Sequence, residues 1–392
     1  MFLFSMSIQQ LAARCVAVLS VIWLAGCDGL MIGGTGGQNI NPNRAVPVAL
    51  LVPRGSGSST DEVLAQNLEN AARLAIADLN GVEIDLRVYN TAANPTQASS
   101  VAMQAVNDGA KIIIGPLYAA AANAAGVSVA NRNVNVLAFS NNTSIAGGNV
   151  FVLGATFENT ANRLVSYSKR QGTARMLVVH AQDVAGEVGR DAIIRAAERH
   201  GVQISGVESY PFSQQGIFEA SRRIAQNAQL GSSDTVFLTA GTAADLPFIA
   251  TSLPEAGLRA DEVRFLGLTR WNSPPQTLSL PGLQGGYFTL PDQSLEQRFQ
   301  ARYRAAYGSS PHPLAGLAYD GIAAIGALVS TGEADAITTR QLTRSAGFAG
   351  TQGIFRLRAD GTNERGLAVA QVQNNQVVIV DPAPKSFSGA GF

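Results

Sequence analysis

The sequence predicts an α/β fold made of two doubly wound parallel-sheet lobes joined by hinge crossovers. Apolar segments with strand character alternate with segments of helical periodicity from Val46 onward, and a second series of the same kind begins near residue 158. Such alternation is typical of right-handed βαβ units built around parallel sheets. The chain has 392 residues, 46% of them hydrophobic, which favours two lobes over one.

Each segment of the first series has its own signal. A run of apolar residues predicts a strand at 46–53. The helix predicted at 60–80 begins at a capping threonine and repeats its apolar residues at helical spacing. The remaining segments alternate in the same way, with strands at 82–90, 111–115 and 134–140 and helices at 95–109 and 118–133.

The second series repeats this order. One of its helices ends at Gly201, and glycine commonly terminates helices. The predicted helices are 158–172, 186–201, 217–231 and 243–257, and the predicted strands are 174–181, 202–211, 234–240 and 263–269.

The segments after residue 291 are expected to return the chain to both lobes. They comprise helices at 294–307 and 315–331 and strands at 353–358 and 367–380. The sequence therefore predicts lobe 1 from 46–157 plus 292–350, lobe 2 from 158–291 plus 351–381, and a loose tail at 382–392.

The N-terminus has the features of a secretory signal. Its apolar run from Cys15 to Ala25 has 11 residues, whereas a membrane-spanning helix needs about 20. The run ends in the letters LAGC, residues 24–27, which resemble the cleavage box of bacterial lipoproteins. We therefore expect residues 1–26 to be a signal peptide and Cys27 to be lipidated.

The residues around this signal refine the expected location. Translation from Met6 instead of Met1 would give a more ordinary signal, because residues 1–5 are apolar and precede any basic residue. Asp28 resembles the signal that retains lipoproteins in the inner membrane of enteric bacteria, and so favours the inner membrane over the outer. Residues 27–45 are rich in Gly and Asn and are predicted to form a flexible tether. The expected location is the periplasm, close to the membrane.

The composition argues against several classes of protein. The 28 basic and 28 acidic residues give no net charge, and no basic cluster suggests nucleic-acid binding. Both cysteines lie in the first 27 residues, and the three histidines are far apart, so neither a thiolate nucleophile nor a metal site is expected. No nucleotide fingerprint or Gly-x-Ser-x-Gly elbow occurs. We expect no catalytic residues and no cofactor, and therefore a protein that is not an enzyme.

Several motifs follow one another in an order that resembles a known family. They are GPLYAAAANAAG at 115–126, VLAFSNNTS at 136–144, AGEVGRDAI at 185–193, and longer stretches at 303–328 and 347–372. Over about residues 46–381, the chain resembles the leucine/isoleucine/valine-binding branch of the type I periplasmic binding proteins, which includes lipoprotein activators of penicillin-binding proteins. The resemblance implies two lobes that close on a small ligand by hinge motion.

The resemblance also implies where the ligand would bind, namely beyond the carboxyl ends of the strands. The family holds an α-carboxylate there with hydroxyls and helix amides, and an α-ammonium with an acidic side chain. Ala119 replaces the first hydroxyl, Ala185 replaces a tyrosine, and Arg270 with Trp271 stands where the acid is expected. The candidate ligand-binding residues are Tyr118, Ala119, Asn142, Thr143, Ser144, Asp183, Arg270 and Trp271.

These substitutions argue against a standard α-amino acid as ligand, because burying an ammonium without an acidic partner is costly. We expect instead a small anionic or uncharged polar ligand, with an ABC permease as partner. The alternative is an activator lipoprotein that docks on a penicillin-binding protein, because the stretch LTRWN at 268–272 resembles one found in such activators. From sequence alone, Arg270 and Trp271 either line the cleft or pack at a lobe crossover.

Overall fold

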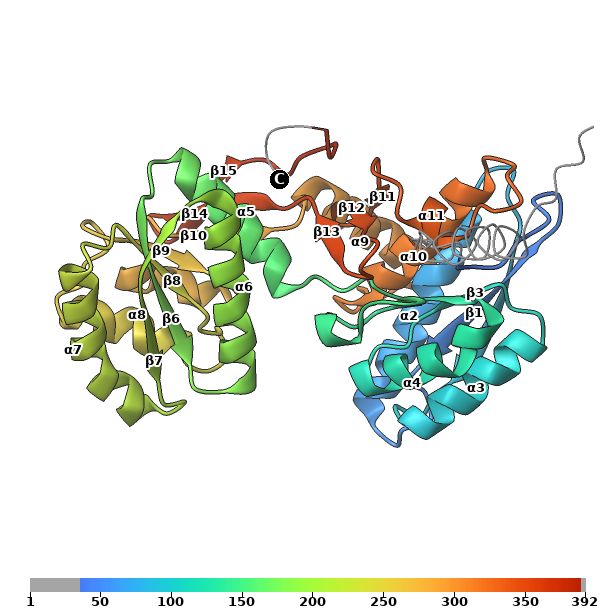
Figure 1. Ribbon diagram of the computed structural model, residues 1–392, viewed down its shortest axis with the longest axis horizontal. Helices are drawn as coiled ribbons and strands as arrows, with labels where there is room; N and C mark the ends of the chain where they lie inside the picture. The colour runs from blue at the N-terminus through green and yellow to red at the C-terminus, as the bar shows by residue number, and fades with distance from the viewer. Residues whose placement is uncertain (1–35, 389–392) are drawn as a thin grey trace, which may run out of the picture. The chain divides into compact units, whose positions relative to one another are not determined.

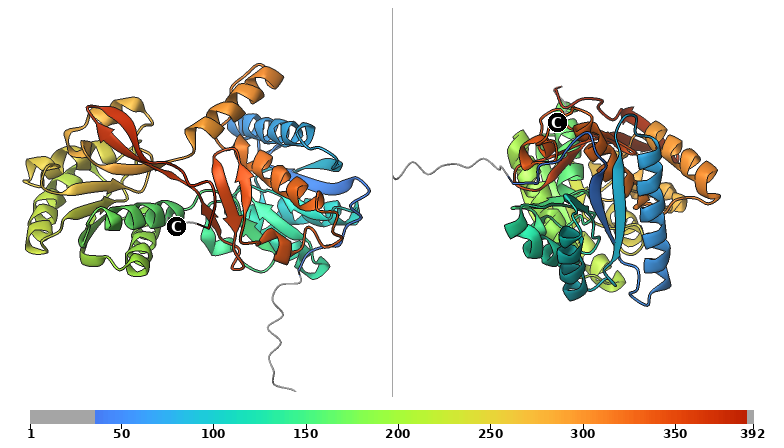
Figure 2. Two further views of the ribbon diagram at one scale, coloured as in Figure 1. Left: turned by 90° about the horizontal axis from the view of Figure 1, so that it is seen from above. Right: turned by 90° about the vertical axis from the view of Figure 1, so that its right-hand side faces the viewer.

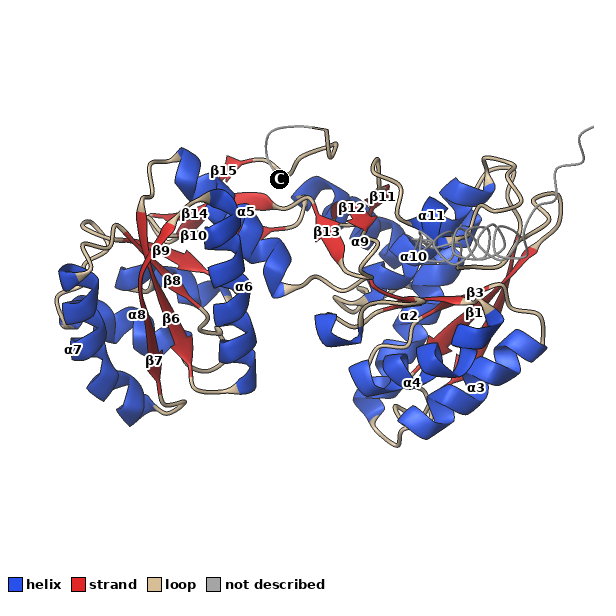
Figure 3. Cartoon of the chain, viewed as in Figure 1, coloured by secondary structure: helices blue, strands red, loops and turns tan. Residues whose placement is uncertain are grey.

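The computed structural model describes residues 36–388, which form two lobes within one compact unit (Figure 1). The predicted signal peptide 1–26 and the predicted lipidation site Cys27 lie outside the described residues. Within the described range, no helix is long and apolar enough to cross a membrane. The predicted fold class is confirmed, because both lobes are built on largely parallel sheets covered by helices (Figure 3).

The sheet of lobe 1 is entirely parallel, with the strand order β2-β1-β3-β4-β5. Its register places Leu50 beside Ile114, so neighbouring strands present apolar side chains on the same face. Parallel sheets of this kind are buried on both faces. The strands are β1 (Val46–Val52), β2 (Ile84–Asn90), β3 (Ile112–Ile114), β4 (Asn135–Ala138) and β5 (Val150–Val152).

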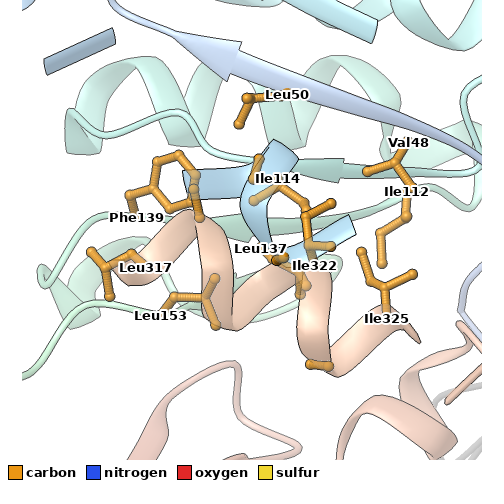
Figure 4. Packing of buried hydrophobic residues seen from close by; sticks show 14 of the residues in the cluster. Val48, Leu50, Ile112, Ile114, Leu137, Phe139, Leu153, Leu317, Ile322 and Ile325 are labelled. Atoms are coloured by element: carbon orange, nitrogen blue, oxygen red, sulfur yellow. The ribbon is translucent and has the colours of Figure 1, made fainter. Parts of the chain in front are cut away.

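Helices cover both faces of this sheet. On one face, Ile322 and Ile325 of helix α10 pack in a core with Ile114 and Leu137 of the sheet (Figure 4). On the other face, α3 and α4 contribute mainly alanines, such as Ala102, whose small side chains let the helices approach closely. The helices of lobe 1 are α2 (Ser59–Ala77), α3 (Pro95–Asn107), α4 (Ala119–Val129), α9 (Gln293–Tyr307), α10 (Ala315–Val329) and α11 (Thr339–Leu342).

The sheet of lobe 2 has the strand order β15-β14-β10-β9-β8-β6-β7. The run from β7 to β10 is parallel, and a hairpin of β14 and β15 adds to it antiparallel. Helices α5 and α6 cover one face, and α7 and α8 cover the other. The elements are α5 (Phe157–Arg170), β6 (Arg175–Ala181), α6 (Val184–His200), β7 (Gln203–Tyr210), α7 (Gln214–Leu230), β8 (Thr235–Leu238), α8 (Leu246–Glu255), β9 (Arg264–Gly267), β10 (Tyr287–Leu290), β14 (Ala368–Gln373) and β15 (Gln376–Asp381).

A small antiparallel sheet belongs to lobe 1. Its side chains Phe348, Phe355 and Leu357 enter the same hydrophobic core as α10. The predicted assignment of 351–365 to lobe 2 is therefore wrong, because these residues bury their apolar face against lobe 1. The strands are β11 (Phe348–Gly350), β12 (Gly353–Leu357) and β13 (Asn363–Arg365).

The chain passes between the lobes at several points. It leaves lobe 1 after β5, returns after β10 to form α9, and passes to lobe 2 again between β13 and β14. The last of these passages is drawn in red in the left-hand view of Figure 2. Neither lobe is a continuous stretch of the sequence.

Two segments predicted to be loose are packed on lobe 1 instead. In the segment 36–45, Ile40 is buried in the core of lobe 1, and its N–H donates a 2.8 Å hydrogen bond to Ala334. In the segment 382–388, the Phe387 ring lies under the Arg356 guanidinium at 4.6 Å. The predicted tether at 27–45 and the predicted loose tail at 382–392 are therefore wrong for these residues.

The long strand predicted at 367–380 is a hairpin. Its two strands pair antiparallel and are joined by Asn374 and Asn375, whose φ angles are 51° and 63°. Positive φ at both central residues defines the tight turn whose twist matches that of paired strands, and asparagine tolerates this conformation better than most residues. The sequence run therefore turns back at its two asparagines.

Candidate functional site

The loop after β3 is built around a close approach of two strands. Gly115 has a φ of 83°, and a Cβ at this position would lie 2.3 Å from the Leu51 carbonyl oxygen. Only glycine fits here, which fixes the path of the chain into α4. That helix begins at Ala119, and its N-cap residue Tyr118 makes no side-chain capping bond. The first-turn amides of α4 are therefore left for another acceptor.

Tyr118 is held by an acidic side chain from a different helix. Its hydroxyl donates a 2.5 Å hydrogen bond to Asp61 Oδ1, in the first turn of α2. Asp61 is buried, whereas Tyr118 is partly exposed. The hydrogen bond to Asp61, together with burial, raises the pKa of the Tyr118 hydroxyl, which stays protonated and acts as a donor. Sequence reasoning did not identify Asp61, because an acidic residue at the start of a helix is expected without any further role.

The segment after β4 keeps polar groups but uses some of them locally. Ser140 Oγ accepts the Asn142 N–H at 3.1 Å, and Asn142 Oδ1 accepts the Ser144 N–H at 2.9 Å. Asn142 and Ser144 are exposed, and Thr143 is half-buried. The Asn142 amide nitrogen and the Thr143 and Ser144 hydroxyls remain available to a ligand. Because β3 and β4 are neighbours in the parallel sheet, this segment lies beside the loop of Tyr118 and Ala119.

In lobe 2, Asp183 serves as a helix cap. Its Oδ1 accepts the Gly186 N–H at 2.7 Å at the start of α6. Capping of this kind satisfies one of the amides that a helix leaves unpaired at its N-terminus. Ala185, which is expected from the sequence to stand in place of the family's tyrosine, is exposed next to it. Asp183 Oδ1 is therefore used to cap the helix, and only the Oδ2 atom is available to bind a ligand.

Arg270 follows the end of β9 and opens onto a cavity of about 450 Å³. Its Nε lies 3.4 Å from Asn272 Oδ1, and its Nη1 lies 3.8 Å from Glu296 Oε1 on α9. Its side chain is 44% exposed, so these contacts leave much of the guanidinium free. Further walls of the cavity come from Phe299 and His312 of lobe 1. The cavity is thus lined by a cationic side chain of lobe 2 and by polar and aromatic side chains of lobe 1.

Trp271 does not line this cavity. Its side chain is fully buried in the core of lobe 2, where it packs on Phe288 with ring centroids 5.6 Å apart. Room for the indole exists because Gly267 and Gly286 lie against it, and a Cβ at either would approach the ring within 3 Å. The prediction of Trp271 as a ligand contact is therefore wrong. Its side chain has no accessible surface to offer.

A buried acid near the same strand ends was missed by sequence reasoning. Asp245 is 5% exposed, and it accepts the Tyr210 hydroxyl at 2.6 Å and the Gly241 N–H at 2.7 Å. Burial, and then the negative charge of Asp245, raises the pKa of Tyr210. Asp245 falls inside the helix predicted from the sequence at 243–257, whereas α8 begins at Leu246 and the Asp245 side chain caps nothing in it.

The structure brings together only part of the predicted site. Tyr118 and Ala119 lie beside Asn142, Thr143 and Ser144, on adjacent loops of lobe 1. In lobe 2, Asp183 and Arg270 follow β6 and β9, which β8 separates. Among residues 36–388, no hydrogen bond or ion pair joins the lobe 1 set to either of these two residues. Nor do three metal-ligating side chains gather anywhere in that range.

This arrangement is that of a binding protein with two lobes, and a comparison with known families agrees. The model of the family described as periplasmic binding protein matches residues 45–376. The chain therefore belongs to the periplasmic binding protein family, which implies a periplasmic location. No curated protein matches the sequence.

Solved structures share the fold over most of the chain. A putative branched-chain amino acid ABC transporter protein from Rhodospirillum rubrum has a TM-score of 0.70 at 16% identity, covering 86% of this chain and 100% of that one. An ABC transporter substrate-binding protein from Desulfitobacterium hafniense in complex with Leu has a TM-score of 0.60 at 17% identity, covering 86% and 100%. A solute-binding protein from R. palustris in complex with benzoate has a TM-score of 0.55 at 17% identity, covering 89% and 99%. The fold is thus that of the type I periplasmic binding proteins.

Proposed function

We propose that this protein is a lipid-anchored substrate-binding component of an ABC-type importer, and that its ligand is a small carboxylate or uncharged polar molecule without an α-ammonium group. The observation that carries the proposal is Arg270, which stands after β9 where the amino-acid receptors of this family present an acidic side chain. A planar guanidinium binds a carboxylate in bidentate fashion and repels an ammonium.

The acids nearest the lobe 2 strand ends support this proposal. Asp245 is buried and already accepts hydrogen bonds from Tyr210 and Gly241. Asp183 caps α6 through the Gly186 N–H. An ammonium entering here would have to compete with these bonds and with the positive charge of Arg270. Burying it without a dedicated partner would be strongly unfavourable.

The groups of lobe 1 suit the other end of such a ligand. The uncapped first turn of α4, which begins at Ala119, provides backbone N–H donors, and helix N-termini favour anions. The exposed side chains of Asn142 and Ser144 add further donors. These groups recognise oxygen atoms rather than one particular side chain. Among the structural neighbours, one binds leucine and another binds benzoate, a carboxylate that has no ammonium.

The alternative function, docking on a penicillin-binding protein, receives no support from the tryptophan of the stretch that suggested it. Trp271, the aromatic residue of the 268–272 stretch, is fully buried in the lobe 2 core. Its presence is explained by packing against Phe288 and by the two glycines that accommodate the ring. A buried side chain offers a partner protein no contact surface.

Calorimetry of the mature chain tests the proposal. The titrants are leucine, isoleucine and valine on one side, and aromatic and aliphatic carboxylates, benzoate included, on the other. We expect a carboxylate to bind and the amino acids to give no saturable heat. Arg270→Ala should weaken the carboxylate by about tenfold or more, because a hydrogen bond to a charged group contributes about 1.5–3 kcal/mol.

The matched control is Arg298→Ala, which removes an exposed arginine of α9 that donates only to its own helix. This variant should bind like the wild type. Micromolar binding of leucine that Arg270→Ala leaves unchanged would overturn the proposal and restore a plain amino-acid receptor.

A further inference from the structure

A second cavity, of about 210 Å³, lies apart from the Arg270 cavity and is strongly basic. Its walls come from helices α5 and α6 of lobe 2 and from the strand region of β12 and β13 in lobe 1. Six basic side chains line it, namely Arg163, Arg199, His200, Arg356, Arg358 and Arg365, and one acidic side chain, Glu364, lies among them. Neither this cavity nor these residues belong to the predicted ligand site.

The acidic groups around the cavity do not neutralise its arginines fully. Glu364 pairs with both Arg356 and Arg358, and Arg358 also lies 3.9 Å from Asp360, at the outer limit of an ion pair. Arg199, at the end of α6, forms no ion pair with any described residue. Positive charge therefore accumulates in a confined space, where a bound anion would be favoured.

The two buried arginines have acidic partners, but neither partner lines the cavity. Arg163 lies 3.1 Å from Asp381, which Arg170 shares at 2.7 Å. Arg365 lies 3.5 Å from the buried Asp320. Burial lowers the pKa of both Arg163 and Arg365, although the nearby carboxylates oppose the shift. Both guanidinium groups remain charged, because arginine keeps its proton in proteins.

Polar atoms on the cavity wall lack hydrogen-bond partners within residues 36–388. Two of them, Arg365 Nε and His200 Nε2, can donate to an anion, whereas the third, Asn162 Oδ1, is an acceptor; all three are buried. The Arg365 side chain is only 4% exposed, so bulk water does not satisfy its Nε. Leaving a buried polar group unpaired destabilises the folded state, and more so when the group is charged. Such groups are rare in folded proteins unless a ligand, ion or ordered water completes them.

We propose that this cavity is a binding site for a compact oxyanion with two negative charges, of the sulfate or phosphate class. Guanidinium groups surround the cavity from four different elements, an arrangement that suits an anion with oxygens pointing in several directions. His200 Nε2 and Arg365 Nε supply further N–H donors. The proposal does not depend on the identity of the cleft ligand, because none of these residues lines the Arg270 cavity.

The position of the site gives the anion a structural effect. Arg163, Arg199 and His200 come from lobe 2, whereas Arg356, Arg358 and Arg365 come from lobe 1. An anion bound by both groups links the lobes and stabilises the relative arrangement in which the cavity is formed. The folded protein is therefore expected to gain thermal stability from sulfate in a saturable manner.

The test uses the mature chain, with sulfate and inorganic phosphate as probes and chloride at matched ionic strength as reference. Calorimetry should show saturable binding of one oxyanion per chain, and the melting temperature should rise along the same isotherm. Arg199→Gln should weaken binding about tenfold, since one charge-assisted hydrogen bond contributes about 1.5–3 kcal/mol. Arg199→Glu should abolish binding. Arg199 is exposed on a helix surface, so both variants are expected to fold.

The matched controls are Arg222→Gln and Arg222→Glu on α7, since Arg222 is also exposed, helical and without an ion pair among the described residues. Both should bind sulfate like the wild type. The imidazole resonances of His200 should shift with sulfate in the wild type and stay unchanged in Arg199→Glu. The proposal is overturned if sulfate gives no saturable signal beyond chloride, or if the Arg222 variants lose binding as the Arg199 variants do.

Discussion

Arg365 Nη1 and Asp320 Oδ2 lie 3.5 Å apart inside lobe 1, next to the point where the chain crosses to lobe 2. Arg365 ends β13, and Asp320 belongs to α10. Asp320 also accepts the Thr351 N–H at 2.6 Å, and Arg365 donates to the Leu153 carbonyl beside another crossover. The pair thus ties together four segments, namely β13, α10, the turn between β11 and β12, and the segment after β5.

Removing one partner of this pair should destabilise the protein strongly. Asp320→Asn leaves the Arg365 charge buried without its counter-charge, which typically costs about 3–5 kcal/mol. Urea unfolding monitored by circular dichroism measures the change. Asp261→Asn is the control, because Asp261 pairs with Arg259 on an exposed surface, where ion pairs contribute little to stability. Equal losses in the two variants would contradict the assigned role.

Trp271 should matter for stability and not for ligand binding. Trp271→Ala empties a large volume beside Phe288, and deletions of this kind cost about 3–5 kcal/mol. Arg270→Ala, one residue earlier, should show the opposite pattern, with weaker ligand binding and nearly unchanged stability. Unfolding and calorimetry on both variants check the pair. A Trp271→Ala protein of wild-type stability would show that the indole is not a core residue.

The contact between Tyr118 and Asp61 should contribute to the order of the lobe 1 binding surface. Tyr118→Phe removes the hydroxyl donor from a buried carboxylate, and a hydrogen bond to a charged group contributes about 1.5–3 kcal/mol. A double-mutant cycle with Asp61→Asn isolates the coupling between the two side chains. We expect a coupling of about 1 kcal/mol or more, because Tyr118 is partly exposed and part of the gain is lost to water. Additive effects of the two changes would exclude a direct interaction.

His200 should make stability depend on pH in the weakly acidic range. Burial, followed by the charges of Arg199 and Arg170, lowers the pKa of His200 below its usual value. The unfolded state then takes up a proton at about pH 6.5, before the folded state does. The full stability is therefore present above about pH 6.5, where His200 is neutral in both states, and stability is lost as the pH falls below that value. The difference between wild type and His200→Gln, measured by urea unfolding from pH 8 to 5, should show this slope, and parallel profiles would contradict it.

The N-terminal prediction concerns residues outside the described range. Cys27 follows a short apolar run in a lipoprotein-like box. Mass spectrometry of the membrane-extracted protein should find a mature chain that begins at a diacylglyceryl-modified Cys27. Cys27→Ser should abolish the modification and leave the signal uncleaved at this site. An unmodified cysteine, or a chain that still begins at Met1 or Met6, would contradict lipid anchoring.

The alternation of strands and helices in both lobes could be predicted from the sequence, because the spacing of apolar residues differs between buried strands and buried helix faces. The direction of the Trp271 side chain could not be predicted in this way. The indole occupies the space left by Gly267 and Gly286, and Gly286 is 15 residues away from Trp271 in the sequence. The Gly- and Asn-rich stretch before Val46 has the composition of a linker, yet Ile40 anchors it. Composition describes the average character of a segment, whereas a single buried side chain such as Ile40 can be enough to pack the segment onto the core.

The same limit applies to the site. Ala119 and Arg270 could be placed by matching motifs, because each stands at a fixed distance from a strand end. The partners Asp61 and Asp245 could not, because Asp61 meets Tyr118 across 57 positions and Asp245 meets Tyr210 across 35. Contacts between helix starts and distant tyrosines have no periodic signature along the chain.

The segment 382–388 has a practical bearing on experiments with this protein. It leaves β15 of lobe 2 but rests on lobe 1, where Phe387 meets Arg356. A fluorophore or purification tag attached after this segment would therefore move with lobe 1, although the preceding strand belongs to lobe 2. A distance sensor that pairs such a label with one on α7 would span the hinge and report domain motion directly.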